Sequence, residues 1–297
     1  MRKFVYEGKL PHLLFYGPPG TGKTTTIMAL AKEIYGPHYK NMVLELNASD
    51  DRGIDVVRNQ IKSFASTMQI FNRGFKLIIL DEADAMTSVA QNSLRRIIEK
   101  YTKNTRFCIL ANYAHKLNPA LVSRCTRFRF LPILSSAIHE RLKDVEAQEK
   151  LKIEPDAESA LIQLSYGDMR KALNVLQACH ASLDNSLDSI DKEAIFECIG
   201  APDPHDIDNV LSSVLQDDWT TSFLTVEKYK KQKGLALIDI IQSFVDKLNK
   251  LQLKPKTRIE LLKGLCDIEY TISRGGNEKI HSSAMVGTIK SAIEFEK

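Results

Sequence analysis

The first 132 residues alternate between short apolar runs and stretches in which apolar residues recur every three or four positions. Short apolar runs are typical of buried strands, and the three-to-four-residue spacing is typical of amphipathic helices. We therefore expect a parallel sheet with helices on both of its faces. The five strands are predicted at residues 12–16, 42–47, 75–80, 106–112 and 127–130.

The pattern changes after Pro132, where the strand-like runs disappear and helical spacing continues along the rest of the chain. A second break falls at residues 198–204, which contain the glycine and prolines that interrupt helices. We therefore expect three parts: an α/β core at residues 1–132, a helical segment at 133–200 and a second helical segment at 201–297.

Residues 17–24 read Gly-Pro-Pro-Gly-Thr-Gly-Lys-Thr and match the phosphate-binding P-loop pattern, between a predicted strand and a predicted helix. The glycines can adopt backbone angles that side chains disfavour, so successive N–H groups can surround a phosphate. The lysine adds positive charge near the β- and γ-phosphates, the threonine hydroxyl suits Mg²⁺, and the helix N-terminus points at the same phosphates. The residues predicted to bind the nucleotide here are Gly17, Pro18, Pro19, Gly20, Thr21, Gly22, Lys23, Thr24 and Thr25.

Polar residues follow two further predicted strands, at the edge where open α/β sheets bind ligands. Asp81 is placed to hold Mg²⁺ through water, and Glu82 is placed to polarise an attacking water. Asn112 ends the fourth predicted strand, where its amide could hydrogen-bond the γ-phosphate or that water. Asp84 is expected to cap the next helix.

Composition narrows the class of protein. The 297 residues, 43% of them hydrophobic, are typical of a soluble protein with two or three domains. A net charge of +4 means that any contact with nucleic acid depends on a local basic surface. The five scattered cysteines contain no C-x-x-C pair, which argues against structural zinc, and we expect each to be a small buried apolar residue. We expect no membrane span and no signal peptide.

Two arginines lie in loop-like contexts. Arg124 belongs to the triplet Ser-Arg-Cys, and an arginine in a loop is by itself an ordinary solvated charge. Arg170 follows Gly-Asp-Met at the start of a predicted helix. A cation there is unfavourable for the helix unless an anion lies nearby, and a nucleotide phosphate would be such an anion.

Together these motifs resemble those of AAA+ clamp loaders, in which G-P-P-G-T-G-K-T, L-D-E-A-D, an asparagine, S-R-C and G-D-M-R occur in this order. The S-R-C triplet resembles the arginine-finger box of the small subunits of replication factor C and of bacterial and archaeal clamp loaders. Residues 46–53 and 111–116 also resemble those small subunits, and the resemblance extends over essentially the whole chain.

The resemblance implies an AAA+ core with a five-stranded parallel sheet at residues 1–132, an α-helical lid at 133–200 and an α-helical collar for oligomerisation at 201–297. It also implies an ATPase that is active in the assembled complex and uses ATP and Mg²⁺.

Individual roles follow from the same resemblance. Glu82 would be the catalytic base, and Asn112 and Arg170 would be the two sensors of the nucleotide. Lys23 and Thr24 would bind the phosphates and Mg²⁺, with Asp81 supporting the metal. Arg124 would act in trans, in the ATP site of the neighbouring subunit, where it would stabilise charge on the transferred phosphoryl group.

The implied partners are other replication factor C subunits in a hetero-pentamer, the sliding clamp (PCNA) and primer–template DNA, in the nucleus and without a membrane. Members of the family carry a V-x-K-Y-R-P-like segment that helps to hold adenine before the first strand. This chain begins after that point, so we expect the N-terminal part of the core to be missing and Pro11 and His12 to lie near the base pocket.

Contacts with DNA are predicted only through the resemblance. Arg52, Arg58 and Lys62 fall on or just before one predicted helix and Thr87 at the start of the next, matching helices that line the inner spiral in this family. Tracking phosphates needs only cations and helix N-termini. Without the resemblance, we would interpret the exposed faces of these two helices as ordinary solvated surfaces.

Other functions remain open on the sequence. The chain could serve a related AAA+ complex in DNA repair or checkpoint clamp loading, or it could be a structural subunit with a nearly inactive site. The presence of Lys23, Asp81 and Glu82 argues against an inactive site. A helicase-like motor or protein remodeller usually has aromatic pore loops or appended domains, and neither is apparent in this sequence. Arg170 and the S-R-C triplet argue against a metabolic kinase.

Overall fold

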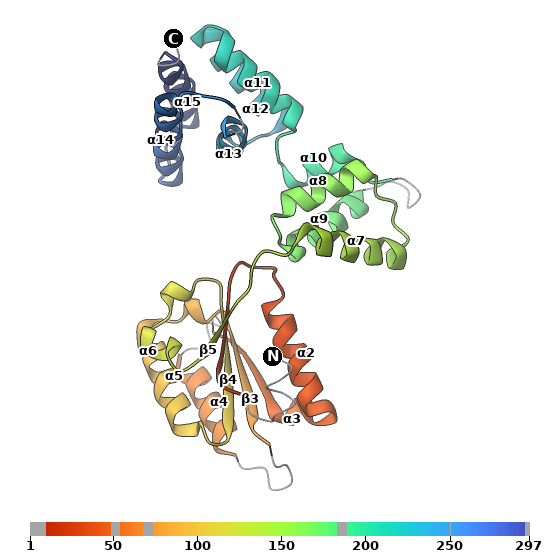
Figure 1. Ribbon diagram of the computed structural model, residues 1–297, viewed down its shortest axis with the longest axis vertical. Helices are drawn as coiled ribbons and strands as arrows, with labels where there is room; N and C mark the ends of the chain where they lie inside the picture. Colours follow the sequence, from red (N-terminus) through yellow and green to blue (C-terminus); the bar gives the residue numbers. More distant parts are fainter. Residues whose placement is uncertain (1–9, 49–53, 68–73, 183–188, 250, 295–297) are drawn as a thin grey trace. The chain divides into compact units, whose positions relative to one another are not determined.

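The computed structural model describes residues 10–48, 54–67, 74–182, 189–249 and 251–294, with the backbone alone described for residues 54–58. Contacts divide the chain into two compact units, Met1–Lys150 with Leu161–Asn174, and Leu151–Ala160 with Val175–Lys297. The first unit holds a sheet with helices, and the second is mainly helical (Figure 1).

The centre of the first unit is a parallel sheet, and five strands of it lie within the described residues. They lie in the order β2-β3-β4-β1-β5, and each neighbouring pair is parallel, which confirms the predicted fold class. Leu14 of β1 pairs with Ile109 of β4 on one side and with Arg127 of β5 on the other. The bounds are β1 Leu13–Tyr16, β2 Val43–Asn47, β3 Lys76–Asp81, β4 Thr105–Ala111 and β5 Thr126–Arg129.

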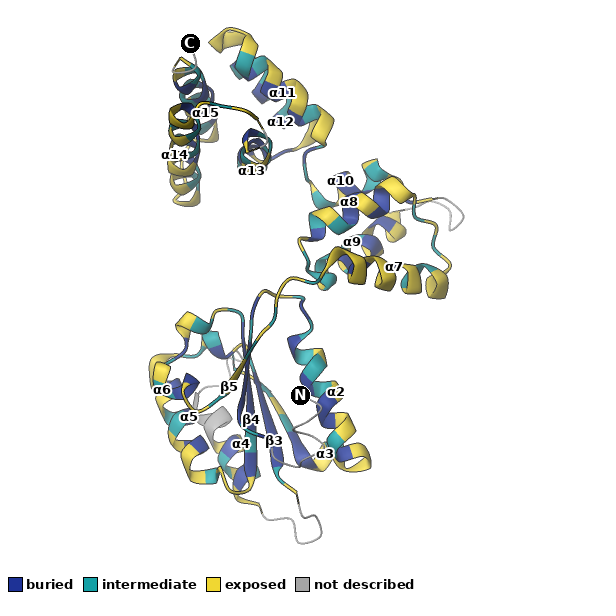
Figure 2. Ribbon diagram, in the orientation of Figure 1, coloured by how far each residue is buried: buried dark blue, intermediate teal, exposed yellow. Residues whose placement is uncertain are grey.

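Alternate residues of the central strands pack on opposite faces of the sheet. Leu13 and Phe15 belong to a cluster with Ile27 on helix α2, whereas Leu14 belongs to a second cluster with Leu94 on α5. Figure 1 shows α2 and α3 on one side of the sheet and α4, α5 and α6 on the other, and Figure 2 shows β3 and β4 buried along most of their length. The central strands β1, β3 and β4 are therefore mostly apolar along their length, because both of their faces are covered. The helices and 3₁₀ turns of this region are α2 Lys23–Tyr35, η1 Gly36–His38, α3 Tyr39–Met42, α4 Ile54–Ser66, η2 Ala83–Ala85, α5 Ser88–Tyr101, η3 Ala114–Lys116 and α6 Pro119–Val122.

Helices follow the sheet, as the sequence predicts. The last five of them build their own core in the second unit, with Ile207, Phe244 and Met285 among its fully buried members. None of the described helices combines the length and the apolar character that crossing a bilayer requires. The bounds are α7 Ser135–Glu149, α8 Pro155–Ser165, α9 Met169–Ser182, α10 Lys192–Ile199, α11 Pro204–Gln216, α12 Trp219–Lys233, α13 Leu237–Leu248, α14 Pro255–Ser273 and α15 Glu278–Ile293.

The cysteines do not share one environment. Cys108 and Cys179 are buried and Cys125 is half-buried, but Cys198 on α10 and Cys266 on α14 are exposed. The expectation that all five are buried apolar residues is therefore wrong for the last two. The prediction assumed that a cysteine lies on the buried face of its helix. Helices α10 and α14 each bury only one face, and these two cysteines lie outside it.

Gly17 joins β1 to the P-loop at a point where two backbones nearly touch. Its N–H donates to the carbonyl oxygen of Ala111 at 3.3 Å, and its φ is +147°. A Cβ at this position would lie 2.1 Å from the carbonyl oxygen of Phe130. Gly22 also has positive φ, +85°, but a Cβ there would meet nothing within 4 Å.

His12 lies just before β1 and is buried. Its Nδ1 accepts a hydrogen bond from the N–H of Phe107 at 3.2 Å, so protonating Nδ1 would place two donors against each other. Burial, assisted by the nearby Arg106 guanidinium, lowers the pKa of His12 to about 4. The imidazole is therefore held neutral in the folded protein.

We expect Gly17→Ala to lower the free energy of unfolding by about 2–3 kcal/mol, because the Phe130 carbonyl must move away from the new methyl group. Gly22→Ala is the matched control and should lose only about 1 kcal/mol, the cost of the left-handed backbone for a residue with a Cβ. Urea denaturation measures both. Equal losses in the two variants would contradict the importance of the close approach at Gly17.

We expect His12 to make the fold sensitive to mild acid. Between pH 6.5 and pH 4 the unfolded chain takes up a proton that the folded chain refuses, so stability falls as the pH falls through this window. The full effect is about 3 kcal/mol. His12→Asn keeps an acceptor but does not titrate, so its urea midpoint should fall less over the same range. A parallel fall in variant and parent would show that His12 is not the cause.

Candidate functional site

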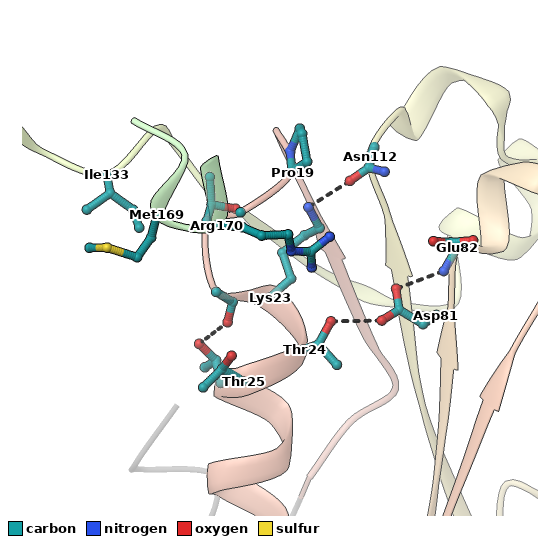
Figure 3. Close-up of a pocket in the computed structure, with 14 residues that line it drawn as sticks. Pro19, Lys23, Thr24, Thr25, Asp81, Glu82, Asn112, Ile133, Met169 and Arg170 are labelled. Carbon is teal, nitrogen blue, oxygen red and sulfur yellow. Dashed lines mark hydrogen bonds between the residues drawn. The ribbon is translucent and has the colours of Figure 1, made fainter. Parts of the chain in front are cut away.

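A pocket of about 430 Å³ lies at the carboxyl ends of β1, β3 and β4 (Figure 3). It brings together most of the residues predicted to form the site, from the P-loop, from the end of β3, from the end of β4 and from the start of α9. Three residues that the sequence did not single out, Thr26, Ile133 and Met169, also line it. The predicted residues that line it are Pro19, Gly20, Thr21, Gly22, Lys23, Thr24, Thr25, Asp81, Glu82, Asn112 and Arg170.

The P-loop turns through two left-handed glycines. Gly20 has φ +64° and Gly22 has φ +85°, as predicted for a loop that aims its N–H groups inward. Gly20 is also needed for space, because a Cβ there would lie 1.6 Å from a carboxylate oxygen of Asp168. The carbonyl oxygen of Gly20 in turn accepts from the N–H of Met169 at 3.2 Å. The loop is therefore fixed against the start of α9.

Lys23 is the first residue of α2 and is buried. Its ammonium donates to the carbonyl oxygens of Gly17 and Pro18, each at 2.8 Å, and to Oδ1 of Asn112 at 2.9 Å. Burial lowers the pKa of Lys23, while the carboxylates of Asp81 and Asp84 oppose that shift. The three acceptors hold the charge at the pocket floor, beside the positive end of the helix.

Thr24, Asp81 and Glu82 form a chain of contacts across the pocket (Figure 3). The hydroxyl of Thr24 donates to Oδ2 of Asp81 at 2.8 Å, and Oδ1 of Asp81 accepts from the N–H of Glu82 at 2.8 Å. Glu82 itself has φ +53°, a left-handed conformation that is uncommon for a residue with a side chain and is concentrated at functional sites. The turn leaves the Glu82 side chain exposed at the pocket.

The donor set at Thr24 and Asp81 fits Mg²⁺, which prefers oxygen ligands and retains several waters. A hydroxyl and a carboxylate oxygen already meet there at 2.8 Å. Across the described part of the chain, histidine, cysteine, aspartate and glutamate nowhere form a group of three that could hold a metal. The pocket therefore suits an ion that phosphate oxygens and water complete, rather than one enclosed by protein.

Asp84 does not cap the following helix, so that expectation is wrong. Thr87 caps α5 instead, by accepting from the N–H of Ala90 at 3.3 Å. The carboxylate of Asp84 accepts from the N–H groups of Asn112 and Tyr113, at 3.2 and 3.1 Å. Asp84 thus fixes the turn after β4 and with it the position of the Asn112 amide, a long-range role that local sequence does not reveal.

Arg170 lies in the first turn of α9, and Figure 3 shows its side chain directed into the pocket, on the side of Lys23. Asp168 caps this helix through Oδ1, which accepts from the N–H of Lys171 at 3.0 Å. Met169 and Ile133 supply an apolar wall that the sequence analysis missed, although Met169 stands inside the G-D-M-R motif. Pro11 and His12 are not among the residues that line this pocket, and their expected place near the base stays a prediction.

Arg124 is not among the residues that line the pocket. It follows α6, and its guanidinium pairs with Glu99 of α5 and donates to the carbonyl oxygen of Ala120. About a third of its side chain, 37%, is exposed. The structure therefore separates Arg124 from the other predicted catalytic residues of its own chain.

The residues predicted to contact DNA do not join the pocket either. Lys62 is half-buried on α4, and Thr87 is exposed at the start of α5, where its hydroxyl acts as the helix cap. Arg58 lies on α4, in the part where the structure describes only the backbone. Arg52 lies outside the described residues.

Comparisons with known proteins agree with this geometry. The ATPase family associated with various cellular activities (AAA) matches residues 13–133, and the replication factor C C-terminal domain matches residues 202–288. Replication factor C subunit 3 of Saccharomyces cerevisiae is 65% identical over 298 residues, covering 100% of this chain and 88% of that protein. Replication factor C subunit 5 of Homo sapiens is 50% identical over 291 residues, covering 98% and 84%.

Among solved structures, the RuvB Holliday junction branch migration motor of Thermotoga maritima matches with a TM-score of 0.51 and 16% identity, covering 86% of each chain. At that identity the likeness concerns the fold alone. The high identities to replication factor C subunits confirm the resemblance predicted from the motifs, and these relatives include subunit 3 of the fungal complex. The chain belongs to the replication factor C subunit family and carries its AAA ATPase domain.

Proposed function

We propose that this chain is an ATP-hydrolysing subunit of a sliding-clamp loader. The observation that carries the proposal is the convergence of Lys23, Asp81, Glu82 and Asn112 at one pocket, in a chain of the replication factor C family. Binding ATP here drives the opening of the clamp, and hydrolysis follows its placement on DNA.

The P-loop binds the nucleotide phosphates. Its N–H groups and the N-terminus of α2 surround them, and the Lys23 ammonium exchanges carbonyl acceptors for β- and γ-phosphate oxygens. This exchange is favourable because a buried ammonium gains more from a phosphate anion than from neutral carbonyls. The apolar wall of Ile133 and Met169 suits the flat face of the base.

Hydrolysis needs a water aimed at the γ-phosphorus. Glu82 orients this water and accepts its proton, and the Asn112 amide, held through the backbone contact with Asp84, fixes the γ-phosphate. Thr24 and Asp81 would hold Mg²⁺, which neutralises charge on the phosphates when bound. Arg170, in the first turn of α9, contacts the same phosphates.

Arg124 serves a neighbouring subunit. Its position outside the pocket of its own chain and its exposure support a role in trans. The ion pair with Glu99 keeps the guanidinium ordered at the surface until a neighbour's nucleotide is present. An arginine supplied in this way typically raises hydrolysis by about 10³-fold or more.

The partners follow from the family. The chain would join other replication factor C subunits in a hetero-pentamer in the nucleus, with residues 133–200 as its lid and 201–297 as its collar. The sliding clamp (PCNA) and primer–template DNA would be bound by the assembled ring. Lys62, half-buried on α4, and Thr87, exposed at the N-terminus of α5, suit phosphate contacts with such DNA. Arg52 and Arg58 stay predicted contacts.

We expect Glu82→Gln and Arg124→Ala to separate the chain's own site from its neighbour's. Glu82→Gln should retain ATP binding and lower turnover at its own site by about 10²–10⁴-fold, because an amide cannot accept the proton. Arg124→Ala should leave the chain's own ATP affinity unchanged and lower turnover at the adjacent site by about 10³-fold. Nucleotide binding is measured on the single chain, and turnover on the assembled complex.

Arg127→Ala is the matched control for Arg124→Ala, since Arg127 is an exposed arginine that the pocket does not include. Arg127→Ala should change neither the chain's own ATP affinity nor the turnover at the adjacent site. Weakened ATP binding by the Arg124→Ala chain itself, with normal turnover in the complex, would contradict the role in trans.

A further inference from the structure

Two cysteines of the second unit face each other across neighbouring helices. Cys179 lies on α9 and is buried, with 1% of its surface exposed, and Cys198 lies on α10 and is exposed. Figure 1 shows α9 and α10 in the same helical cluster. Neither residue has a part in the nucleotide site.

The hydrogen bonds of the two thiols are reciprocal. The thiol of Cys179 donates to the carbonyl oxygen of Ala194 at 3.6 Å, and that of Cys198 donates to the carbonyl oxygen of Val175 at 3.9 Å. In an α-helix each of these carbonyls bonds to the N–H four residues further on, which here belongs to the other cysteine. Each thiol therefore reaches the helical turn that carries its counterpart.

The surroundings give the two thiols different roles. Burial, assisted by the neighbouring Cys198, raises the pKa of Cys179 to about 12, so this thiol stays protonated at neutral pH and is not the first to react with a dissolved oxidant. Cys198 stands at the surface, where a small oxidant dissolved in water can reach its sulfur.

We propose that Cys179 and Cys198 are a modification site, at which hydrogen peroxide forms a reversible disulfide between α9 and α10. The thiolate of Cys198 attacks one peroxide oxygen, the O–O bond breaks, and hydroxide leaves, so Cys198 becomes a sulfenic acid while the peroxide is reduced. The hydroxide released in this step takes the Cys179 proton and becomes water, and the Cys179 thiolate then attacks the sulfur of Cys198. The S–O bond breaks, the S–S bond forms, and hydroxide leaves.

Proximity makes the second step fast, because the attacking sulfur is already beside its target and needs no diffusion. A reducing compartment returns the pair to thiols by exchange with glutathione or thioredoxin-like proteins, so the bond is a transient state rather than a structural one. The pairing also protects Cys198 from further oxidation, since the disulfide consumes the sulfenic acid.

In the test, the chain is treated with hydrogen peroxide, the remaining thiols are blocked by alkylation, and the peptides are mapped by mass spectrometry. We expect a cross-linked pair of peptides containing Cys179 and Cys198, lighter by two hydrogens and restored by dithiothreitol. Cys266→Ser is the matched control, because it removes an exposed cysteine on another helix and should leave the cross-link intact.

Cys198→Ser should abolish the cross-link and leave Cys179 resistant to peroxide. Cys179→Ser should abolish it too and let Cys198 proceed to the sulfinic acid. Because Cys198 is exposed, Cys198→Ser should fold normally, and circular dichroism checks this. Oxidation of Cys198 to sulfinic acid in the parent chain, with Cys179 still open to alkylation after unfolding, would overturn the proposal, as would a disulfide involving Cys266.

Discussion

The buried ammonium of Lys23 is the constraint around which the nucleotide site is arranged. A charge with so little exposure needs acceptors, and the fold supplies them from the two P-loop carbonyls before it and from Asn112 after β4. The same geometry requires the close passage of Gly17 along Phe130 and the left-handed turns at Gly20 and Gly22. The sheet, the loop and the helix together therefore hold one positive charge at the pocket, where it can bind a phosphate.

That centre also joins parts that are distant in sequence. Asp84 holds the turn after β4, Asp81 holds Thr24, and the start of α9 packs on the P-loop through Gly20 and Asp168. Residues 161–174 belong to the same compact unit as the sheet for this reason, although strands are absent from the sequence pattern after residue 132. A nucleotide bound here would therefore meet side chains from four segments.

Sequence alone predicted the parts of the site whose chemistry depends on local spacing. The P-loop glycines, the Asp81–Glu82 pair and the apolar strands follow from motifs and periodicity, and the five-stranded sheet is confirmed. The contacts of Asp84, the close approach at Gly17 and the wall of Ile133 and Met169 did not follow, because each depends on segments brought together only by folding. The exposure of Cys198 and Cys266 was missed for a related reason, since a cysteine is compatible with either face of an amphipathic helix. The role of Arg124 stays a prediction, because it concerns a site on another subunit.

By the same reasoning as for Arg124, we propose that this chain hydrolyses ATP efficiently only when a neighbouring subunit completes its site. Steady-state ATP turnover tests it most directly, measured on the purified chain alone and again after mixing with its partner subunits, clamp and primed DNA. We predict negligible turnover alone and a large rise on full assembly. Brisk turnover by the isolated chain, unaffected by partners, clamp or DNA, would contradict the account and identify a self-sufficient ATPase.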